Sequence, residues 1–284
     1  MSNTNDFAHP EVLVDTAWVA EHLDDAAVRF IEVDVDTSAY DGGHLPGAVG
    51  WNWTTQTQDP VRRDIPDQAA FQTLMSGSGV DNGMTVVFYG DNNNWFATYA
   101  FWLLKMYGHD DVRMVDGGRK KLEAEDRLTT ASVPTPAATH YQASALNDAT
   151  RAYRQNVLDH LDNPAGGLVD VRSPGEFSGE LLAPAALPQE GAQRGGHIPG
   201  AANIVWSRAV AEDGTFKSFG DLTALYGDNG ITADKDIIAY CRIGERSSHT
   251  WFVLTYLLGY PKVRNYDGSW TEWGSSIGLP IEKP

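Results

Sequence analysis

The chain has one cysteine, Cys241, and the residues around it suit a sulfur nucleophile. Arg242 follows it directly, and Arg246 lies four positions further on. The thiolate is the reactive form of cysteine, and positive charges close to a thiol lower its pKa. A lone cysteine can also be a small buried apolar residue. The two arginines favour the first interpretation, so we predict that Cys241 attacks an electrophilic sulfur and holds it as a persulfide.

The elements on either side of this loop would position the thiol. The apolar, β-branched run Asp236–Tyr240 predicts a buried strand, and residues 247–258 have helical spacing. A short loop between a strand and a helix turns backbone N–H groups inward and places a helix N-terminus beside the first loop residue. Both features are expected to lower the pKa of the Cys241 thiol.

Two copies of one unit make up the chain. Residues 41–48 read DGGHLPGA, and residues 194–201 read RGGHIPGA, 153 positions later. The stretch 128–146 is rich in Ser, Thr, Ala and Pro and lacks apolar periodicity, which is typical of a linker. We therefore expect one domain at residues 1–140 and a second at residues 141–284.

Strand and helix patterns alternate within each copy. Short apolar runs predict strands at Val28–Asp34, Thr85–Tyr89, Val112–Val115, 167–171, Asp236–Tyr240 and Val263–Tyr266. Helical spacing occurs at residues 67–76, 95–107, 151–161, 221–226 and 247–258. This alternation predicts an α/β fold with two parallel sheets, each flanked by helices on both faces. Ligands bind such sheets at the carboxyl ends of the strands, where Cys241 stands.

The composition disfavours several classes of partner. With 21 basic and 38 acidic residues, the chain has a net charge of −17, which repels nucleic-acid phosphates and anionic lipid headgroups. Its richest apolar stretch, 251–258, is far shorter than the roughly 20 residues that cross a bilayer. One cysteine cannot form an intrachain disulfide, and the first residues lack the pattern of a signal peptide. We expect a cytoplasmic protein without nucleic-acid or membrane partners.

Three motifs together indicate a family. The loop CRIGER (241–246) resembles the active loop of the thiosulfate sulfurtransferases, or rhodaneses, in which Cys-Arg-x-Gly-x is followed by Thr or Arg. HIPGA (197–201) resembles the family's Gly-His-Ile-Pro-Gly-Ala signature, and DGSWTEW (267–273) resembles its closing Asp-Gly-Gly/Ser-x-x-x-Trp signature. The chain departs from the vertebrate-type enzymes at Ile243, where those have lysine. Motif order and tandem layout agree over nearly all of the chain.

This resemblance implies a double displacement without a metal or an organic cofactor. The Cys241 thiolate would attack the outer sulfur of thiosulfate and expel sulfite, and an acceptor, cyanide or a thiol, would then remove the sulfur. Arg242 and Arg246 would bind the sulfonate oxygens. Backbone N–H groups of the loop would stabilise the persulfide, with the cradle formed by Ile243, Gly244, Glu245 and Ser247.

Arg194 is a further candidate for anion binding. It precedes the repeated Gly-Gly-His turn at the position where the first copy has Asp41. This charge difference suits a substrate-binding role, although an ordinary surface arginine would look the same. The paired residues Asp170 and Arg172, by contrast, are expected to bind each other within the fold.

The first copy lacks the means for this chemistry. Gly90 stands at the position of Cys241, and the loop continues with one aspartate and three asparagines (91–94). Without thiol or arginine, the first domain is predicted to be catalytically silent. Trp51 and Trp53 either line a substrate cleft or belong to the core.

Other functions remain open at this point. A cysteine phosphatase or arsenate reductase places five residues between cysteine and arginine, whereas only four separate Cys241 from Arg246, which leaves too small a loop for a tetrahedral oxyanion. A 3-mercaptopyruvate sulfurtransferase tends to have Cys-Gly-Ser-Gly in the loop. A non-catalytic sulfur carrier module would hold the persulfide without turnover.

Overall fold

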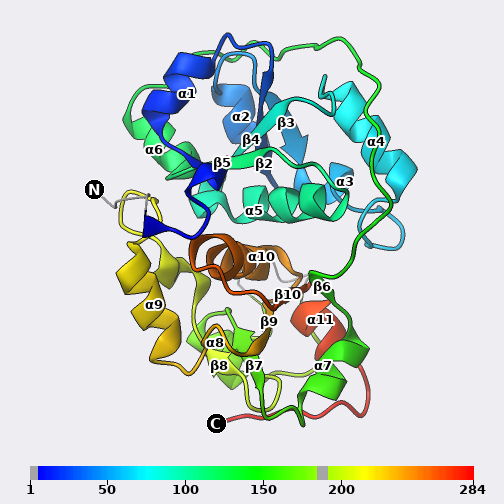
Figure 1. The fold of residues 1–284 in the computed structure, drawn as a ribbon. Coiled ribbons are helices and arrows are strands. Elements are labelled where there is room, and N and C mark those ends of the chain that lie inside the picture. The colour runs from blue at the N-terminus through cyan, green and yellow to red at the C-terminus, as the bar shows by residue number, and fades with distance from the viewer. Residues whose placement is uncertain (1–5, 184–190) are drawn as a thin grey trace. The chain divides into compact units, whose positions relative to one another are not determined.

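The protein is described by a computed structural model over residues 6–183 and 191–284 (Figure 1). The first sheet contains β1 (Leu13–Val14), β2 (Val28–Asp34), β3 (Val49–Asn52), β4 (Thr85–Tyr89) and β5 (Val112–Val115). Its helices are α1 (Thr16–His22), α2 (Ser38–Gly42), α3 (Trp53–Gln56), α4 (Gln68–Gly77), α5 (Asp91–Met106) and α6 (Gly118–Ala124).

The second sheet repeats the first. It contains β6 (Arg151–Ala152), β7 (Gly166–Asp170), β8 (Ala202–Asn203), β9 (Asp236–Tyr240) and β10 (Val263–Tyr266). Its helices are α7 (Arg154–His160), α8 (Pro174–Ser178), α9 (Phe219–Gly227), α10 (Glu245–Phe252) and α11 (Ser269–Trp273). Among the described residues, none of these helices has both the length and the apolar character needed to span a membrane.

Both sheets are parallel and share one strand order. The orders are β1-β5-β4-β2-β3 and β6-β10-β9-β7-β8, so β4 and β9 occupy the centres. Tyr240 pairs with Asp170 on one side and with Tyr266 on the other. The residue after β9 therefore emerges at the carboxyl edge between two paired strands, where an α/β sheet places its ligands.

Helices cover both faces of each sheet, which confirms the predicted fold class. In the first sheet, Phe30 and Val87 pack with Val19 of α1 and Leu122 of α6. In the second, Ile238 and Tyr240 pack with residues of α7 and α11, and α10 lies against β9 and β10 on the opposite face. Successive side chains of a strand point to opposite faces of the sheet, and helices bury both faces. This explains the continuous apolar runs in the sequence.

The six predicted strands are the six inner strands. Five match the observed bounds, and β7 begins one residue earlier than expected. The four strands that the apolar pattern missed, β1, β3, β6 and β8, are all edge strands. They are two to four residues long. Edge strands lack the apolar run of a strand buried on both faces, so their pattern is weak.

Two helix predictions need correction. The predicted helix 151–161 begins with strand β6, and α7 starts only at Arg154. The predicted helix 247–258 starts earlier, at Glu245, and changes at Val253–Leu257 into a π-helical turn. The Ala8 and His9 amides donate to the carbonyl oxygens of Leu257 and Tyr256 in this turn, so residues 6–10 pack with the second unit.

A short segment of the second repeat packs with the first unit. Residues 210–216 form a turn closed by the Val210–Phe216 bridge. The Phe216 amide donates to Asp116 at 2.8 Å, and Lys121 pairs with Asp213 at 2.9 Å. The compact units therefore exchange short segments, which the sequence repeat alone did not indicate.

Candidate active site

Cys241 occupies the predicted position at the carboxyl end of the central strand β9. Its side chain is fully buried. Gly244 caps the following helix α10 in the left-handed conformation, with φ of 95°, and Glu245 is the first helical residue. The loop is thus a tight strand–turn–helix connection.

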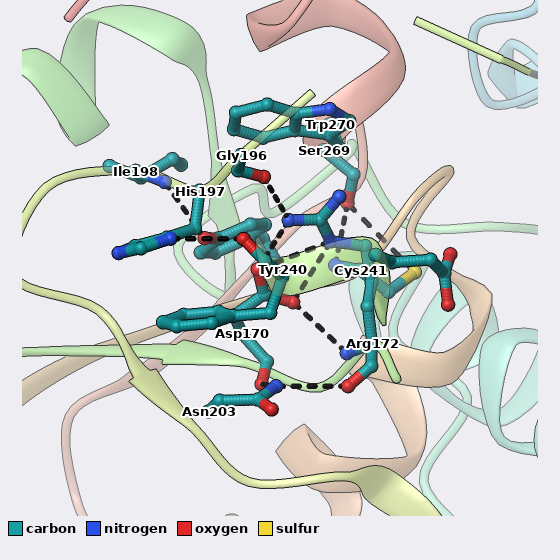
Figure 2. Close-up of polar contacts among 12 residues, drawn as sticks. Asp170, Arg172, Gly196, His197, Ile198, Asn203, Tyr240, Cys241, Ser269 and Trp270 are labelled. Atoms are coloured by element: carbon teal, nitrogen blue, oxygen red, sulfur yellow. Dashed lines mark hydrogen bonds and ion pairs between the residues drawn. The ribbon is translucent and has the colours of Figure 1, made fainter. Parts of the chain in front are cut away.

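Backbone and side-chain groups surround the sulfur. The Gly244 amide donates to Sγ at 3.1 Å, which places one predicted N–H of the cradle. Sγ also donates to Oε2 of Glu245 at 3.2 Å. The Cys241 amide donates to Oγ of Ser269 at 3.0 Å, and the same Oγ lies 4.0 Å from Sγ. Figure 2 shows Ser269 and Cys241 facing each other below the Trp270 ring.

Strand β10 and the turn after it lock the loop from the side. The Asn265 amide nitrogen donates to the Gly244 carbonyl at 3.0 Å, and its oxygen accepts from the Ser247 hydroxyl at 2.6 Å. A Cβ at Gly244 would lie 2.5 Å from Cα of Asp267. Only glycine fits here, because both the positive φ and the close backbone exclude a side chain.

The pKa of the Cys241 thiol differs from the expectation. Burial raises this pKa, and the charge of Glu245 raises it further. Arg246 and hydrogen bonds to Ser247 act in the opposite direction without reversing the shift. The prediction of a lowered pKa was therefore wrong, because it counted the arginines and the helix N-terminus but not desolvation or the neighbouring carboxylate.

Arg246 points to a carboxylate rather than offering an open anion site. Its two terminal nitrogens each donate to Glu176 at 3.0 Å, and both side chains are buried. Burial alone would raise the pKa of Glu176, but the bonds and charge of Arg246 lower it to about 2. Glu176 also accepts from the Ser173 amide, so this carboxylate joins the cap of α8 to α10. In this structure Arg246 forms a buried ion pair with Glu176, and its predicted sulfonate contact stays a prediction.

The side chains of Arg242 and Ile243 are also buried. The Arg242 carbonyl accepts from the amide and the hydroxyl of Thr271, at 3.0 and 2.7 Å. These bonds tie the loop to α11. The partner that anchors Arg242 thus comes from a distant element, whereas the predicted roles of Arg242 and Ile243 stay predictions.

Arg194 has a structural position. Its guanidinium donates to the carbonyl oxygens of Trp273, Gly274, Ser276 and Leu279. These carbonyls belong to the end of α11 and the chain after it, where a cation satisfies helix C-terminal acceptors. All three guanidinium nitrogens of Arg194 donate to carbonyls inside the fold, and its predicted substrate-binding role stays a prediction.

A buried ion pair supports the loop from below. Arg172 pairs with Asp170 at 2.6 Å, donates to the Gly196 carbonyl at 2.8 Å, and stacks under the Trp270 ring at 4.5 Å (Figure 2). The expected internal pairing of Asp170 with Arg172 is confirmed. Tyr240, next to the cysteine, accepts from the Ile198 amide at 3.0 Å, so the HIPGA turn is anchored to the end of β9.

Three residues of the site were not singled out from the sequence. They are Glu176, Asn265 and Ser269. A Ser-x-x-Glu capping pattern at residues 173–176 was visible, but its contact with Arg246 was not. Ser269 adopts a φ of 50°, which is unusual for a residue other than glycine and places its Oγ at the Cys241 amide.

The remaining sequence candidates belong to the core. Trp51 is fully buried and donates to Ser78 at 2.8 Å, and Trp53 packs against Phe96 and Tyr99. Their interpretation as core aromatics is the correct one. Within the described ranges, no group of three or more His, Cys, Asp or Glu side chains could hold a metal ion.

Comparison with known proteins agrees with the sequence motifs. The description "Rhodanese-like domain" matches twice, at residues 15–125 and 154–276. A "Putative thiosulfate sulfurtransferase" of Saccharopolyspora erythraea is 57% identical over 96% of this chain and 97% of its own. The "Sulfur carrier protein TtuD" of Thermus thermophilus is 55% identical over 98% of both chains.

A solved structure shares the whole architecture. The 3-mercaptopyruvate sulfotransferase SseA of Escherichia coli superposes with a TM-score of 0.78 at 27% identity, covering 91% of this chain and 98% of its own. One family thus accounts for both domains of the chain. The chain belongs to the rhodanese family and carries two rhodanese-like domains in tandem.

Proposed function

We propose that this protein is a thiosulfate sulfurtransferase that works through a persulfide on Cys241. The observation that carries the proposal is the position of the thiol, at the end of β9 with the Gly244 amide aimed at Sγ from 3.1 Å. An N–H donor and a helix N-terminus stabilise a sulfur anion at this place. The name of the Saccharopolyspora relative supports thiosulfate as the donor.

The reaction follows two displacements. The thiolate attacks the outer sulfur of thiosulfate, and sulfite leaves with the electron pair of the broken bond. Cyanide or a thiol then attacks the sulfur held on Cys241 and restores the thiolate. Arg242 keeps its proposed role at the sulfonate oxygens, whereas Arg246 acts on the loop through Glu176. A single thiol without a disulfide partner suits a reducing compartment, and we propose the cytoplasm.

Steady-state assays with thiosulfate and 3-mercaptopyruvate, each with cyanide as acceptor, test the donor. We expect a higher kcat/KM for thiosulfate, because Arg242 places a guanidinium directly after the nucleophile and fills the space that a carbon chain would need. A ratio in favour of mercaptopyruvate would reject thiosulfate as the donor and leave sulfur transfer in place.

A sulfur carrier function is the second candidate, favoured by the 55% identical Thermus relative of that name. A carrier accepts one sulfur and releases it to a partner protein, so it turns over slowly with cyanide. Mass spectrometry after thiosulfate treatment, followed by a cyanide chase, separates the two. Repeated turnover supports the enzyme, and one stable added sulfur supports the carrier.

A further inference from the structure

The carboxylate of Glu245 is in direct contact with the proposed nucleophile. Oε2 accepts from Sγ of Cys241 at 3.2 Å, and both residues are buried. Glu245 stands four positions after Cys241, as the first residue of α10. Nε of Arg246 lies 3.6 Å from the other oxygen, Oε1, so the carboxylate is held between a cation and the thiol.

This contact conflicts with simple thiolate chemistry. A carboxylate that accepts from a thiol stabilises the protonated form, and burial acts in the same direction. The thiol must nevertheless lose its proton to form a persulfide. A buried site offers few places for this proton, and the Glu245 oxygen is already hydrogen-bonded to the sulfur.

We propose that Cys241 and Glu245 share one proton through the catalytic cycle, with Glu245 as the acceptor when the sulfur is loaded. The proposal rests on the sulfurtransferase function proposed above. In the free protein the proton is on Sγ and the carboxylate is ionised. As Sγ bonds to the outer sulfur of thiosulfate and sulfite leaves, the proton moves to Oε2.

The balance of charge supports this assignment. A persulfide is a stronger acid than a thiol, so it releases its proton more readily than the Cys241 thiol does. In the proposed loaded state its terminal sulfur carries the negative charge and Glu245 carries the proton. The thiol with a carboxylate and the persulfide anion with a carboxylic acid both have a charge of −1. When the acceptor removes the outer sulfur, the electron pair of the broken bond returns to Sγ and the proton returns from Oε2. The Cys241–Glu245 pair therefore carries a single negative charge in both its free and its loaded state, whereas two adjacent anions in a buried site would be costly.

Two further carboxylates near the pair are held in ion pairs. Glu176 is paired with Arg246, and Asp267 is paired with Arg151 at 3.0 Å. Burial lowers the pKa of His249, on the same helix, to about 3, so this imidazole stays neutral. A titration near neutral pH at this site therefore reports on the sulfur and its carboxylate.

The first test is the pH dependence of thiol alkylation by iodoacetamide in Glu245→Gln. Removing the charge beside Sγ should lower the alkylation midpoint by about one pH unit or more, which is a tenfold faster reaction on the acid side. Glu245→Asp should lie between this variant and the wild type. The exposed Glu180→Gln is the matched control and should leave the midpoint unchanged. An unshifted midpoint in folded Glu245→Gln means that the two groups do not share a proton.

The second test counts the proton itself. Thiosulfate is added in weak buffer near pH 7, and an indicator dye records the protons released per sulfur gained. Sulfite takes up protons equally in all variants, so the difference between variants is informative. Glu245→Gln should release about one proton more than the wild type, because it has no carboxylate to accept it. Equal release contradicts the proposal.

Failure of the proposed sulfurtransferase function can be distinguished from failure of the shared-proton proposal. A wild-type protein that gains no mass from thiosulfate is not a thiosulfate sulfurtransferase, and the alkylation midpoints still decide whether the pair exists. If Glu245→Gln does not fold, as judged by circular dichroism, Glu245→Asp takes its place. A wild-type midpoint in that folded variant contradicts the shared proton, because the shorter side chain cannot maintain the 3.2 Å contact.

Discussion

The loops after the central strands β4 and β9 stand at matching positions in the two sheets. The backbone amide of the first loop residue has a different hydrogen-bond acceptor in each. In the first domain, the Gly90 amide donates to Oδ1 of Asn94 at 3.0 Å. In the second, the matching Cys241 amide donates to Oγ of Ser269 at 3.0 Å. Asn94 stands at the position of Glu245. The Asn94 side chain therefore occupies the interior of the first loop. In the second loop Ser269 accepts from the Cys241 amide, and Glu245 accepts from Sγ of Cys241 instead.

The backbone conformations of the two loops also differ. Asn92, Asn93 and Asn94 all have positive φ, between 45° and 66°, so the first turn of α5 is left-handed. Asparagine tolerates this region better than most residues. In the second domain the positive φ falls on Gly244, and α10 starts regularly at Glu245. The comparison teaches that the two loops differ in their whole backbone conformation and not only in the presence of a thiol.

The largest expected effect is the loss of Cys241. Wild-type protein treated with thiosulfate should gain about one sulfur atom per chain, as expected for one nucleophilic thiol. Cys241→Ser should gain none and show no turnover, which intact-protein mass spectrometry and the cyanide assay measure. Appreciable transfer by this variant would place the chemistry elsewhere.

The matching position of the first domain provides the control. Asn94→Ala removes two buried hydrogen bonds, to the Gly90 amide and to the Val115 carbonyl, and should cost about 1–3 kcal/mol. Sulfur loading should stay at one atom per chain, because the first loop has no part in it. Loss of loading in folded Asn94→Ala would contradict the silent role of this domain.

Next in size is the ion pair that holds the active loop. Arg246→Ala leaves the buried Glu176 carboxylate unpaired, so the free energy of unfolding should fall by about 3–5 kcal/mol. Denaturant unfolding measures this loss. The exposed pair of Arg62 with Asp59 is the control, and Arg62→Ala should cost less than about 1 kcal/mol. Similar losses in both variants would contradict the larger contribution to stability expected from the buried pair.

A smaller effect is expected at Gly244. Gly244→Ala and Gly278→Ala both place a side chain at positive φ, 95° and 84°. That conformation costs about 1–2 kcal/mol for a residue with a Cβ. Only the Cβ at residue 244 meets backbone, 2.5 Å from Asp267, while nothing lies within 4 Å of the Cβ at residue 278. Gly244→Ala should therefore be less stable than Gly278→Ala and should load sulfur more slowly. Equal stability and equal loading rates in the two variants would contradict a role for the close packing at residue 244.

The smallest effect concerns pH, where the domains should respond in opposite directions. In the first, burial and the neighbouring Asp91 raise the pKa of Asp34 to about 9, and burial raises that of Asp116 to about 6. The folded first domain thus binds more protons than the unfolded chain, so its stability should increase as the pH falls from about 8 towards 5.

In the second domain, stability should instead decrease as the pH falls. The pKa of Glu176 is about 2 when folded, so its contribution is complete above the unfolded value near 4.5 and is lost as the pH falls towards 2. Hydrogen exchange resolved by peptide can follow each domain separately. Asp34→Asn should flatten the response of the first domain, and Glu176→Gln should remove the acid loss of the second. A common response of both domains would contradict these shifts.

The sequence by itself determined the α/β class, the duplication, the six inner strands and the place of Cys241 in the loop after a central strand. These features depend on patterns of neighbouring residues, because a strand buried on both faces needs a continuous apolar run and a nucleophile loop needs its glycine and charges close by. The prediction that the first loop is silent has the same local basis, since Gly90 and its neighbours include neither a thiol nor an arginine.

Only the tertiary structure decided what the charged residues of the site do. Arg246 meets Glu176, 70 positions earlier, and Arg194 meets carbonyls about 80 positions later. The shift in the pKa of Cys241 depends on burial and on Oε2 of Glu245, which points inward instead of to solvent. Sequence shows which charges exist, but their effect depends on distance and desolvation, and both are set only when distant segments pack together.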